Sequence, residues 1–177
     1  MSAVVAVTKK DAFTLMARGH KDICTLVDKL SPSAATKRAT IGGGEWSAKD
    51  LLGHLTSWEE HALKALDAWK AGEPAPIDAT LKSERGVDQI NAKTFIEKAA
   101  MTWTDIRDQY DDVHAALVKA LKAVKDDAWS ATVTGGEKKP LWERVGGILG
   151  GPSGPFAHEE AHLGDLRAYV EEATRNS

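Results

Sequence analysis

The sequence has a single cysteine, Cys24, among 177 residues. One cysteine cannot form an internal disulfide, and it excludes every zinc site built from several thiolates. The chain also lacks an apolar run of about 18 residues, the length that a membrane-spanning helix needs. The short apolar stretch near the N-terminus follows no basic region and is too short for a signal peptide. We therefore expect a cytoplasmic protein without a membrane partner.

An excess of positive charge is missing as well. Lys and Arg total 23 against 26 Asp and Glu, which gives a formal net charge of -3. Both signs are mixed along every segment, whereas a protein that binds nucleic acid usually shows a basic excess or a basic stripe. We accordingly expect no nucleic acid among the partners of this chain.

Many segments, by contrast, have apolar residues at the spacing of an α-helix. Hydrophobic residues make up 42% of the chain and recur at steps of three and four. The predicted long helices run over residues 8–30, between Ser47 and Gly72, from Thr104 to Val124, and from Pro155 to Ala173. A weaker, shorter helix is predicted over 81–101, interrupted by Gly86. Amphipathic helices of this length pack as bundles, so we expect one all-α domain over 1–177, a four-helix bundle with an extra shorter helix in its middle.

Two stretches carry loop signals. Residues 126–140 are predicted to form a loop, and 145–155 are rich in Gly and Pro. The second stretch is no phosphate-binding loop, because Gly151-Pro152-Ser153 stands where such a loop needs Gly-Lys-Ser or Gly-Lys-Thr. We expect it to shape the mouth of a pocket ahead of the last helix.

Two histidines of the last helix, His158 and His162, lie four residues apart. This spacing places both imidazoles on one helix face, about 6 Å apart at Cβ, so both can reach one metal ion. Imidazole suits zinc, nickel, copper or iron alike. A third ligand must come from another part of the chain. Spacing does not choose among the remaining histidines, which are His20, His54, His61 and His114. Each of them, taken alone, is also expected as a core or boundary residue.

The same segment, His158-Glu159-Glu160-Ala161-His162, matches the short zinc-protease pattern H-E-x-x-H. The longer metalloprotease pattern requires glycine at position 165 and histidine at position 168. Asp165 and Ala168 stand there instead, and too little chain follows for a ligand on a later helix. We therefore set the protease interpretation aside.

Two segments resemble the DinB-like superfamily. Residues 45–55, EWSAKDLLGHL, resemble its second-helix signature, and residues 158–167, HEEAHLGDLR, resemble its last helix. Residues 88–92 and 102–105 are similar to the branch that contains the colibactin self-resistance protein and its DfsB-like relatives. The run Gly-Gly-Pro-Ser-Gly at 150–154 departs from the family pattern.

This resemblance, and not spacing, selects His54 as the third ligand. It implies a DinB-like four-helix bundle that holds a divalent metal ion, zinc or nickel, with His54, His158 and His162, often in a homodimer. It further implies a metal-dependent hydrolase or thiol transferase acting on a small electrophilic molecule, in detoxification or self-resistance. The alternative is a non-catalytic module that binds or sequesters a small molecule, with a structural metal or none.

Several neighbours of these histidines have two interpretations. Asp165 lies on the face of His158 and His162, where it either orients an imidazole or is solvated. We expect Glu59 and Glu159 to point outward and Cys24 to be buried and inert. The six tryptophans are expected mostly in the core or at helix entries, although three of them are also candidates to line a ligand cavity: Trp46, Trp58 and Trp142.

Overall fold

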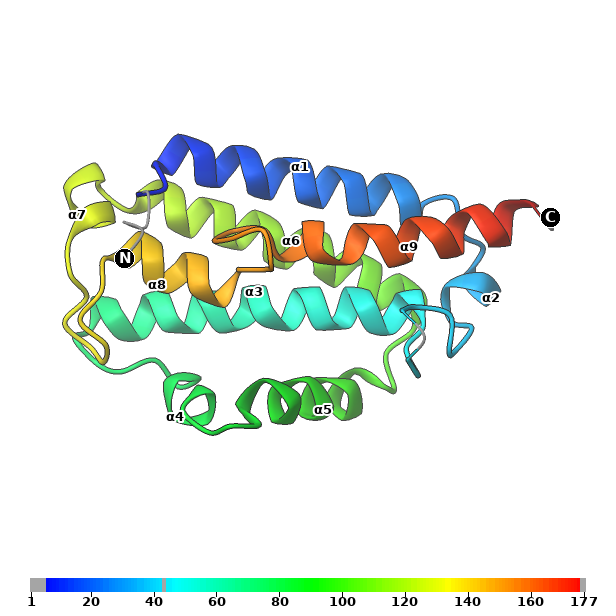
Figure 1. Ribbon diagram of the computed structural model, residues 1–177, viewed down its shortest axis with the longest axis horizontal. Coiled ribbons are helices and arrows are strands. Elements are labelled where there is room, and N and C mark those ends of the chain that lie inside the picture. The colour runs from blue at the N-terminus through cyan, green and yellow to red at the C-terminus, as the bar shows by residue number, and fades with distance from the viewer. Residues whose placement is uncertain (1–5, 43, 176–177) are drawn as a thin grey trace.

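Four long helices lie side by side in the computed structural model, which describes residues 6–42 and 44–175 (Figure 1). They are α1 (Lys9–Val27), α3 (Ala48–Lys70), α6 (Trp103–Ala123) and α9 (His158–Arg175). The shorter helices are α2 (Pro32–Ala35), α4 (Asp78–Leu81), α5 (Gly86–Lys98), α7 (Asp126–Ser130) and α8 (Leu141–Ile148). The described residues contain no strand and no helix long and apolar enough to cross a membrane. The prediction of an all-α four-helix bundle with an extra helix in its middle is confirmed.

Side-chain caps fix where three of the long helices begin. Thr8 accepts a hydrogen bond from the Asp11 amide at the start of α1. Ser47 caps α3 in a reciprocal capping box with Asp50. The cap of α6 is Thr102, two residues before the predicted start at Thr104, because the Asp105 carboxylate reaches back to the Thr102 amide at 3.1 Å.

The Ser47 cap supports a testable prediction, since α3 carries His54. Ser47 is only 1% exposed, and its Oγ accepts from the Asp50 amide at 3.1 Å. Ser47→Ala should therefore lower the free energy of unfolding in urea by about 1 kcal/mol or slightly more. The exposed Ser83→Ala is the matched control and should change stability by less than about 0.5 kcal/mol. Equal stabilities of the two variants would contradict this role of the cap.

Two groups of buried apolar side chains fill the bundle at different heights along its axis. The first includes Met16, Leu117 and Phe156, and the second includes Ile23 and Leu166. Four tryptophans are buried, as expected, and they are Trp58, Trp69, Trp129 and Trp142. Along each of α1, α3 and α6 one group follows the other, so the residues between them on these helices lie at the level where the groups meet.

The segment before α9 differs from the prediction. Helix α8 continues to Ile148, inside the stretch predicted to be irregular, and α7 interrupts the loop predicted over 126–140. Helix α9 begins at His158 rather than at Pro155, because Gly151 and Gly154 exchange backbone hydrogen bonds at 3.0 and 2.9 Å and reverse the chain. As a result α8 and α9 follow one another along one row of the bundle (Figure 1).

The middle region forms two helices instead of one interrupted helix. Gly86 begins α5, and a side chain there would place its Cβ 2.1 Å from the Thr80 carbonyl oxygen. The glycine therefore permits the close turn between α4 and α5. Both helices lie outside the four-helix bundle, along α3 (Figure 1). This placement sets α5 beside the segment of α3 that carries His54.

Candidate metal centre

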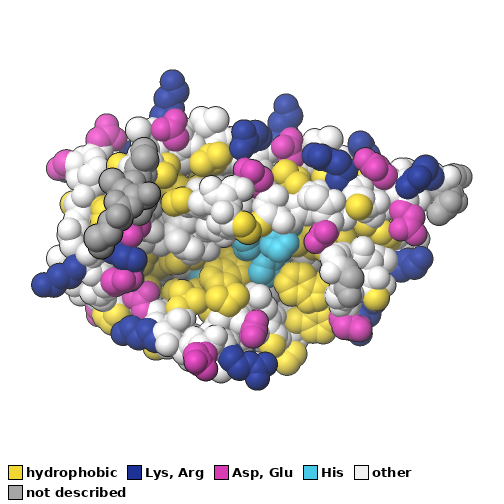
Figure 2. Space-filling view, in the orientation of Figure 1, with side chains coloured by type: hydrophobic (Ala, Val, Ile, Leu, Met, Phe, Trp, Pro, Cys, Tyr) yellow, Lys and Arg dark blue, Asp and Glu magenta, His cyan; other side chains and the backbone are white. Residues whose placement is uncertain are grey.

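Three imidazoles converge where α3 meets the start of α9. His54 lies in the second turn of α3, His158 is the first residue of α9, and His162 follows one turn later. The Nε2 atoms of His54 and His158 are 2.9 Å apart, and one ring nitrogen from each of the three residues lies within 4.8 Å of the others. In Figure 2 histidine side chains are visible in a hollow between hydrophobic side chains. Residues 104 positions apart in the sequence thus share one site.

The environment keeps these imidazoles neutral. Burial lowers the pKa of His54 to about 2, helped by His158 and His162. Burial, with His162, lowers the pKa of His158 to about 3. Burial also lowers the pKa of His162, which the charge of Asp165 opposes. Neutral imidazole has a free lone pair, the form that binds a metal ion.

The donor set fits a divalent metal ion. Nitrogens around a tetrahedral zinc with bonds of 2.0–2.1 Å lie about 3.4 Å apart. The separation of 2.9 Å between His54 and His158 needs only a small movement to reach that value. Three neutral nitrogens from two helices leave a position open for water or substrate.

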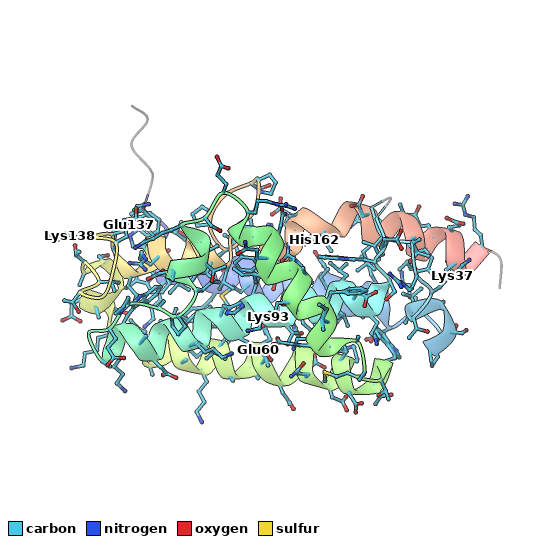
Figure 3. All side chains as sticks on the ribbon, turned by 90° about the horizontal axis from the view of Figure 1, so that it is seen from below. Lys37, Glu60, Lys93, Glu137, Lys138 and His162 are labelled. Carbon is cyan, nitrogen blue, oxygen red and sulfur yellow. The ribbon has the colours of Figure 1, made fainter. Side chains whose placement is uncertain are left out.

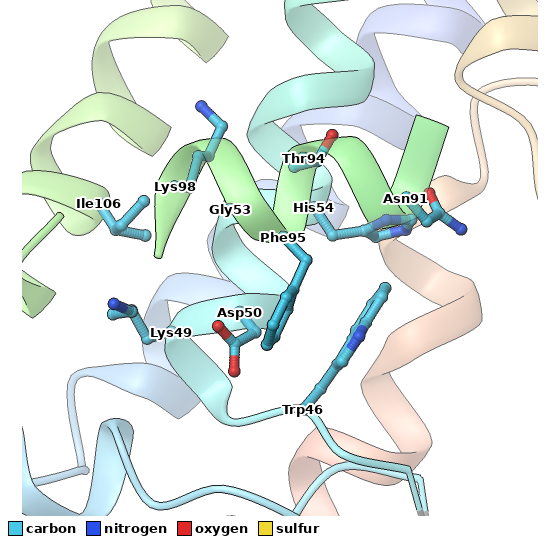
Figure 4. Close-up of a pocket in the computed structure, with 10 residues that line it drawn as sticks. All are labelled: Trp46, Lys49, Asp50, Gly53, His54, Asn91, Thr94, Phe95, Lys98 and Ile106. Atoms are coloured by element: carbon cyan, nitrogen blue, oxygen red, sulfur yellow. The ribbon is translucent and has the colours of Figure 1, made fainter. Parts of the chain in front are cut away.

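Aromatic side chains surround His54. The ring of Trp46 lies 4.8 Å from that of His54, and the ring of Trp58 lies 6.3 Å away. The Trp58 indole N–H donates to the Asn91 side chain of α5 at 3.1 Å, which links α5 to the site. A small pocket beside His54 is lined by Asn91 and Phe95 of α5 together with Trp46 (Figure 4). Trp142, the third cavity candidate, packs in the buried core instead.

The other histidines lie away from this site. His61 has its ring 6.1 Å from Trp58 and lines a cavity between α3 and α5. His20 and His114 stack on each other inside the bundle, with ring centroids 3.9 Å apart. The structure therefore brings His54, rather than these alternatives, next to His158 and His162. Figure 3 labels His162 at the beginning of α9.

Asp165 forms no hydrogen bond with either histidine of α9 among the described residues. Its Oδ2 lies against Gly42, where a Cβ atom would approach to 2.7 Å. Burial lowers the pKa of His162, and the charge of the Asp165 carboxylate opposes that lowering only in part. Of the two interpretations of Asp165, the structure favours a solvent-exposed neighbour over a hydrogen-bonded orienting partner.

Glu59 and Glu159 are buried, and the prediction that they point outward is wrong. Their exposed fractions are 2% and 5%. The His114 Nδ1 and the Glu59 Oε1 are 2.8 Å apart. Glu59 lies four residues after Leu55, and Glu159 lies seven before Leu166, so both fall on apolar faces of their helices. That spacing was the signal that the sequence offered for them.

Burial changes the acidity of this pair and of their partner. Burial raises the pKa of Glu159 to about 7, and the charge of Glu59 adds to the effect. Burial also raises the pKa of Glu59, which the hydrogen bond with His114 opposes. For His114 burial favours the neutral form, but the hydrogen bond and charge of Glu59 outweigh it and raise the pKa.

Cys24 is half-buried and should be a slow nucleophile. Burial raises the pKa of its thiol from 9.0 to about 11, against the opposing charge of Arg107. Its thiolate fraction at pH 8 is then about 100-fold smaller than usual. A more basic thiolate is also the better nucleophile, which raises the reaction rate of each thiolate by about tenfold. Alkylation by iodoacetamide at pH 8 should thus be about tenfold slower than in the unfolded chain, and the rate should still rise above pH 10. A rate that levels off near pH 9 would contradict this.

Comparison with known families identifies the chain. The sequence model described as the DinB superfamily matches residues 16–166. The chain belongs to the DinB superfamily. The resemblance carried by residues 45–55 and 158–167 is therefore confirmed. A comparison with curated protein sequences finds no match.

Solved structures share the DinB fold at low sequence identity. An uncharacterised protein from Escherichia coli UTI89 has a TM-score of 0.78 and 15% identity, with 96% of each chain covered. The colibactin self-resistance protein ClbS, crystallised with a dsDNA, has a TM-score of 0.69 and 11% identity, with 97% of this chain and 96% of that chain covered. A protein from Streptococcus pneumoniae has a TM-score of 0.68 and 10% identity, with 98% and 94% covered.

The prediction that nucleic acid is excluded is wrong. The crystal of ClbS with a dsDNA shows this fold next to nucleic acid. A net charge summed over a sequence says nothing about where the charges gather on a folded surface. The formal charge of -3 therefore does not exclude nucleic acid as a partner of this DinB protein.

Proposed function

We propose that this DinB protein binds a divalent metal ion, zinc or nickel, with His54, His158 and His162. We further propose that it acts on a small electrophilic molecule, as a metal-dependent hydrolase or a thiol transferase. The observation that supports both proposals is the convergence of three neutral imidazoles from α3 and α9, with the Nε2 atoms of His54 and His158 at 2.9 Å. Nitrogen donors suit the later first-row metals better than magnesium or calcium.

The residues of the site have separable roles in this proposal. A divalent ion held by neutral ligands keeps its full charge, lowers the pKa of a bound water or thiol and polarises an electrophile. His54, His158 and His162 would hold the ion and contribute no charge of their own. Trp46 and Trp58 would exclude bulk water from one side and offer an apolar surface to the substrate. The Asn91 side chain would hold the Trp58 ring in place.

Turnover of small electrophiles tests the catalytic proposal. Protein prepared without a metal-affinity tag, loaded with zinc or nickel, is incubated with epoxides, cyclopropanes and alkyl halides, with and without a low-molecular-weight thiol. Mass spectrometry should detect a water or thiol adduct. Chelation or His162→Ala should reduce the rate at least about 100-fold, because metal activation contributes several kcal/mol. His61→Ala, a histidine outside the site, should retain the rate.

Turnover that survives complete removal of the metal would contradict the catalytic proposal. The aromatic rings beside His54 also fit the alternative of a module that binds a small molecule without converting it. Binding of such a molecule that persists in His54→Ala, with no product by mass spectrometry, would favour this alternative. The presence of product in the wild type decides between the two.

A further inference from the structure

A second cluster of polar side chains lies inside the bundle, at the level where the two apolar groups meet. Each of the four long helices contributes one member: His20, Glu59, His114 and Glu159. On α1, for example, His20 lies between Met16 and Ile23, which belong to different apolar groups. This polar layer is separate from the three-histidine site.

The layer is tightly connected. The His114 Nδ1 lies 2.8 Å from Glu59 Oε1, and the ring of His20 covers that of His114 at 3.9 Å. One donor atom each from Glu59, His114 and Glu159 lies within 4.8 Å of the other two, and all three residues are buried. Ligands at adjacent positions of a six-coordinate ion with bonds near 2.1 Å are about 3 Å apart, and opposite ligands are about 4.2 Å apart. The spread of these donor atoms is close to that range.

The hydrogen bonding of the layer is incomplete. Glu59 Oε2 has no hydrogen-bond partner among the described residues. The Tyr110 hydroxyl, on a fully buried side chain, has none either. Burial raises the pKa of this hydroxyl, and the nearby charges of Glu159 and Glu59 add to the effect. His114 pairs with Glu59, and the second buried carboxylate, Glu159, lies close to both without an ion pair of its own to a cationic side chain among the described residues. Such groups are costly to bury unless a cation or further hydrogen bonds compensate them.

The packing leaves room for a carboxylate at this level. Gly19 of α1 faces Glu159, and a Cβ atom at Gly19 would lie 2.8 Å from the Glu159 Cβ. A larger residue at position 19 would displace Glu159 or push α1 away from α9. The glycine therefore allows the two helices to approach closely enough for Glu159 to enter the interior.

We infer that Glu59, His114 and Glu159 form a second site for a divalent cation, of the Mn²⁺ or Fe²⁺ class. Two carboxylates and one imidazole are a harder donor set than three imidazoles, and helical bundles build manganese and iron sites from Glu and His that project into the core. The cation would compensate both carboxylates, and the Tyr110 hydroxyl would donate to one of them or to a water. Binding would release the proton that His114 and Glu59 share.

Manganese binding tests this site apart from the three-histidine site. The starting variant is His158→Ala/His162→Ala, which removes two of the proposed nitrogen ligands of the first site. Equilibrium dialysis and electron paramagnetic resonance should detect one Mn²⁺ ion per chain in the full-length variant, with proton release on binding. Adding Glu59→Gln should weaken the affinity for Mn²⁺ at least about 100-fold. Loss of a residue that only hydrogen-bonds to a metal ligand already lowers metal affinity about 10–100-fold, and Glu59 is proposed as a ligand itself.

The neighbouring substitution Glu60→Gln is the matched control. Glu60 lies where α5 covers α3 and pairs with Lys98 at 3.3 Å, so this variant should bind Mn²⁺ like its parent (Figure 3). Mn²⁺ should also raise the thermal midpoint of the double-alanine parent, a readout that does not depend on how Glu59→Gln folds. No Mn²⁺ binding by the folded parent, or equal binding by the Glu59 and Glu60 variants, would overturn the second site. Because the parent lacks the first site, neither result depends on the proposed function.

Discussion

Nickel at about a thousand times its Kd for the three-histidine site is expected to stabilise the wild type by about 4 kcal/mol and to stabilise a His158→Ala variant by clearly less. A ligand that binds the native state alone shifts unfolding by mass action, and His158 contributes one of three nitrogens within 4.8 Å. For a chain of this size the shift in thermal midpoint is about 8–16 °C. Circular dichroism of metal-free protein, melted with and without nickel, measures it.

His61→Ala serves as the control for this prediction, because His61 lies on the same helix and outside the three-histidine site. It should keep the full nickel-dependent shift. An equal shift in wild type and His158→Ala would place the nickel elsewhere on the protein and contradict the assignment.

Replacing Arg144 with methionine should cause the largest loss of stability away from the metal site. The Arg144 guanidinium donates to both carboxylate oxygens of Asp78 at 2.9 and 2.7 Å and to the Glu137 carbonyl at 2.8 Å. It also lies over the Trp69 ring, 4.6 Å from its centre. The substitution leaves the mostly buried Asp78 without its cation, which should cost about 3 kcal/mol.

Urea unfolding of Arg144→Met measures this cost, and a double variant with Asp78→Asn isolates the pair. The losses in free energy of unfolding for Arg144→Met and Asp78→Asn should add up to clearly more than the loss for the double variant, because the two residues interact directly. Lys82→Met, at an exposed lysine, should change stability by less than about 0.5 kcal/mol. A cost below about 1 kcal/mol for Arg144→Met would mean that the Asp78 pair contributes little.

The sequence was sufficient for the long helices and for two of the three proposed metal ligands. Apolar residues that recur every three or four positions predicted α1, α3 and α6. The four-residue spacing of His158 and His162 placed both on one face of α9. The choice of His54 over His20 and His61 could not come from spacing, because it depends on how α3 packs against α9. Only the family resemblance supplied that information before the structure.

Other features could not be predicted because local signals compete with packing. Pro155 is a favourable first residue for a helix, yet the Gly151–Gly154 reversal keeps the chain turning until His158. The spacing puts Glu59 and Glu159 on the apolar faces of their helices, but charged side chains are seldom fully buried. Whether such a side chain is buried depends on its partners on other helices, such as His114 of α6 for Glu59, and the local pattern does not show those partners.

The metal content of protein purified without a metal-affinity tag shows whether His54, His158 and His162 hold an ion. Elemental analysis is made on wild type and His162→Ala, each expressed with zinc and nickel in the medium. We predict that the wild type carries zinc or nickel and that the folded His162→Ala variant carries about one ion fewer per chain. Equal metal content in the two proteins, or a folded wild type without zinc or nickel after loading, would contradict it.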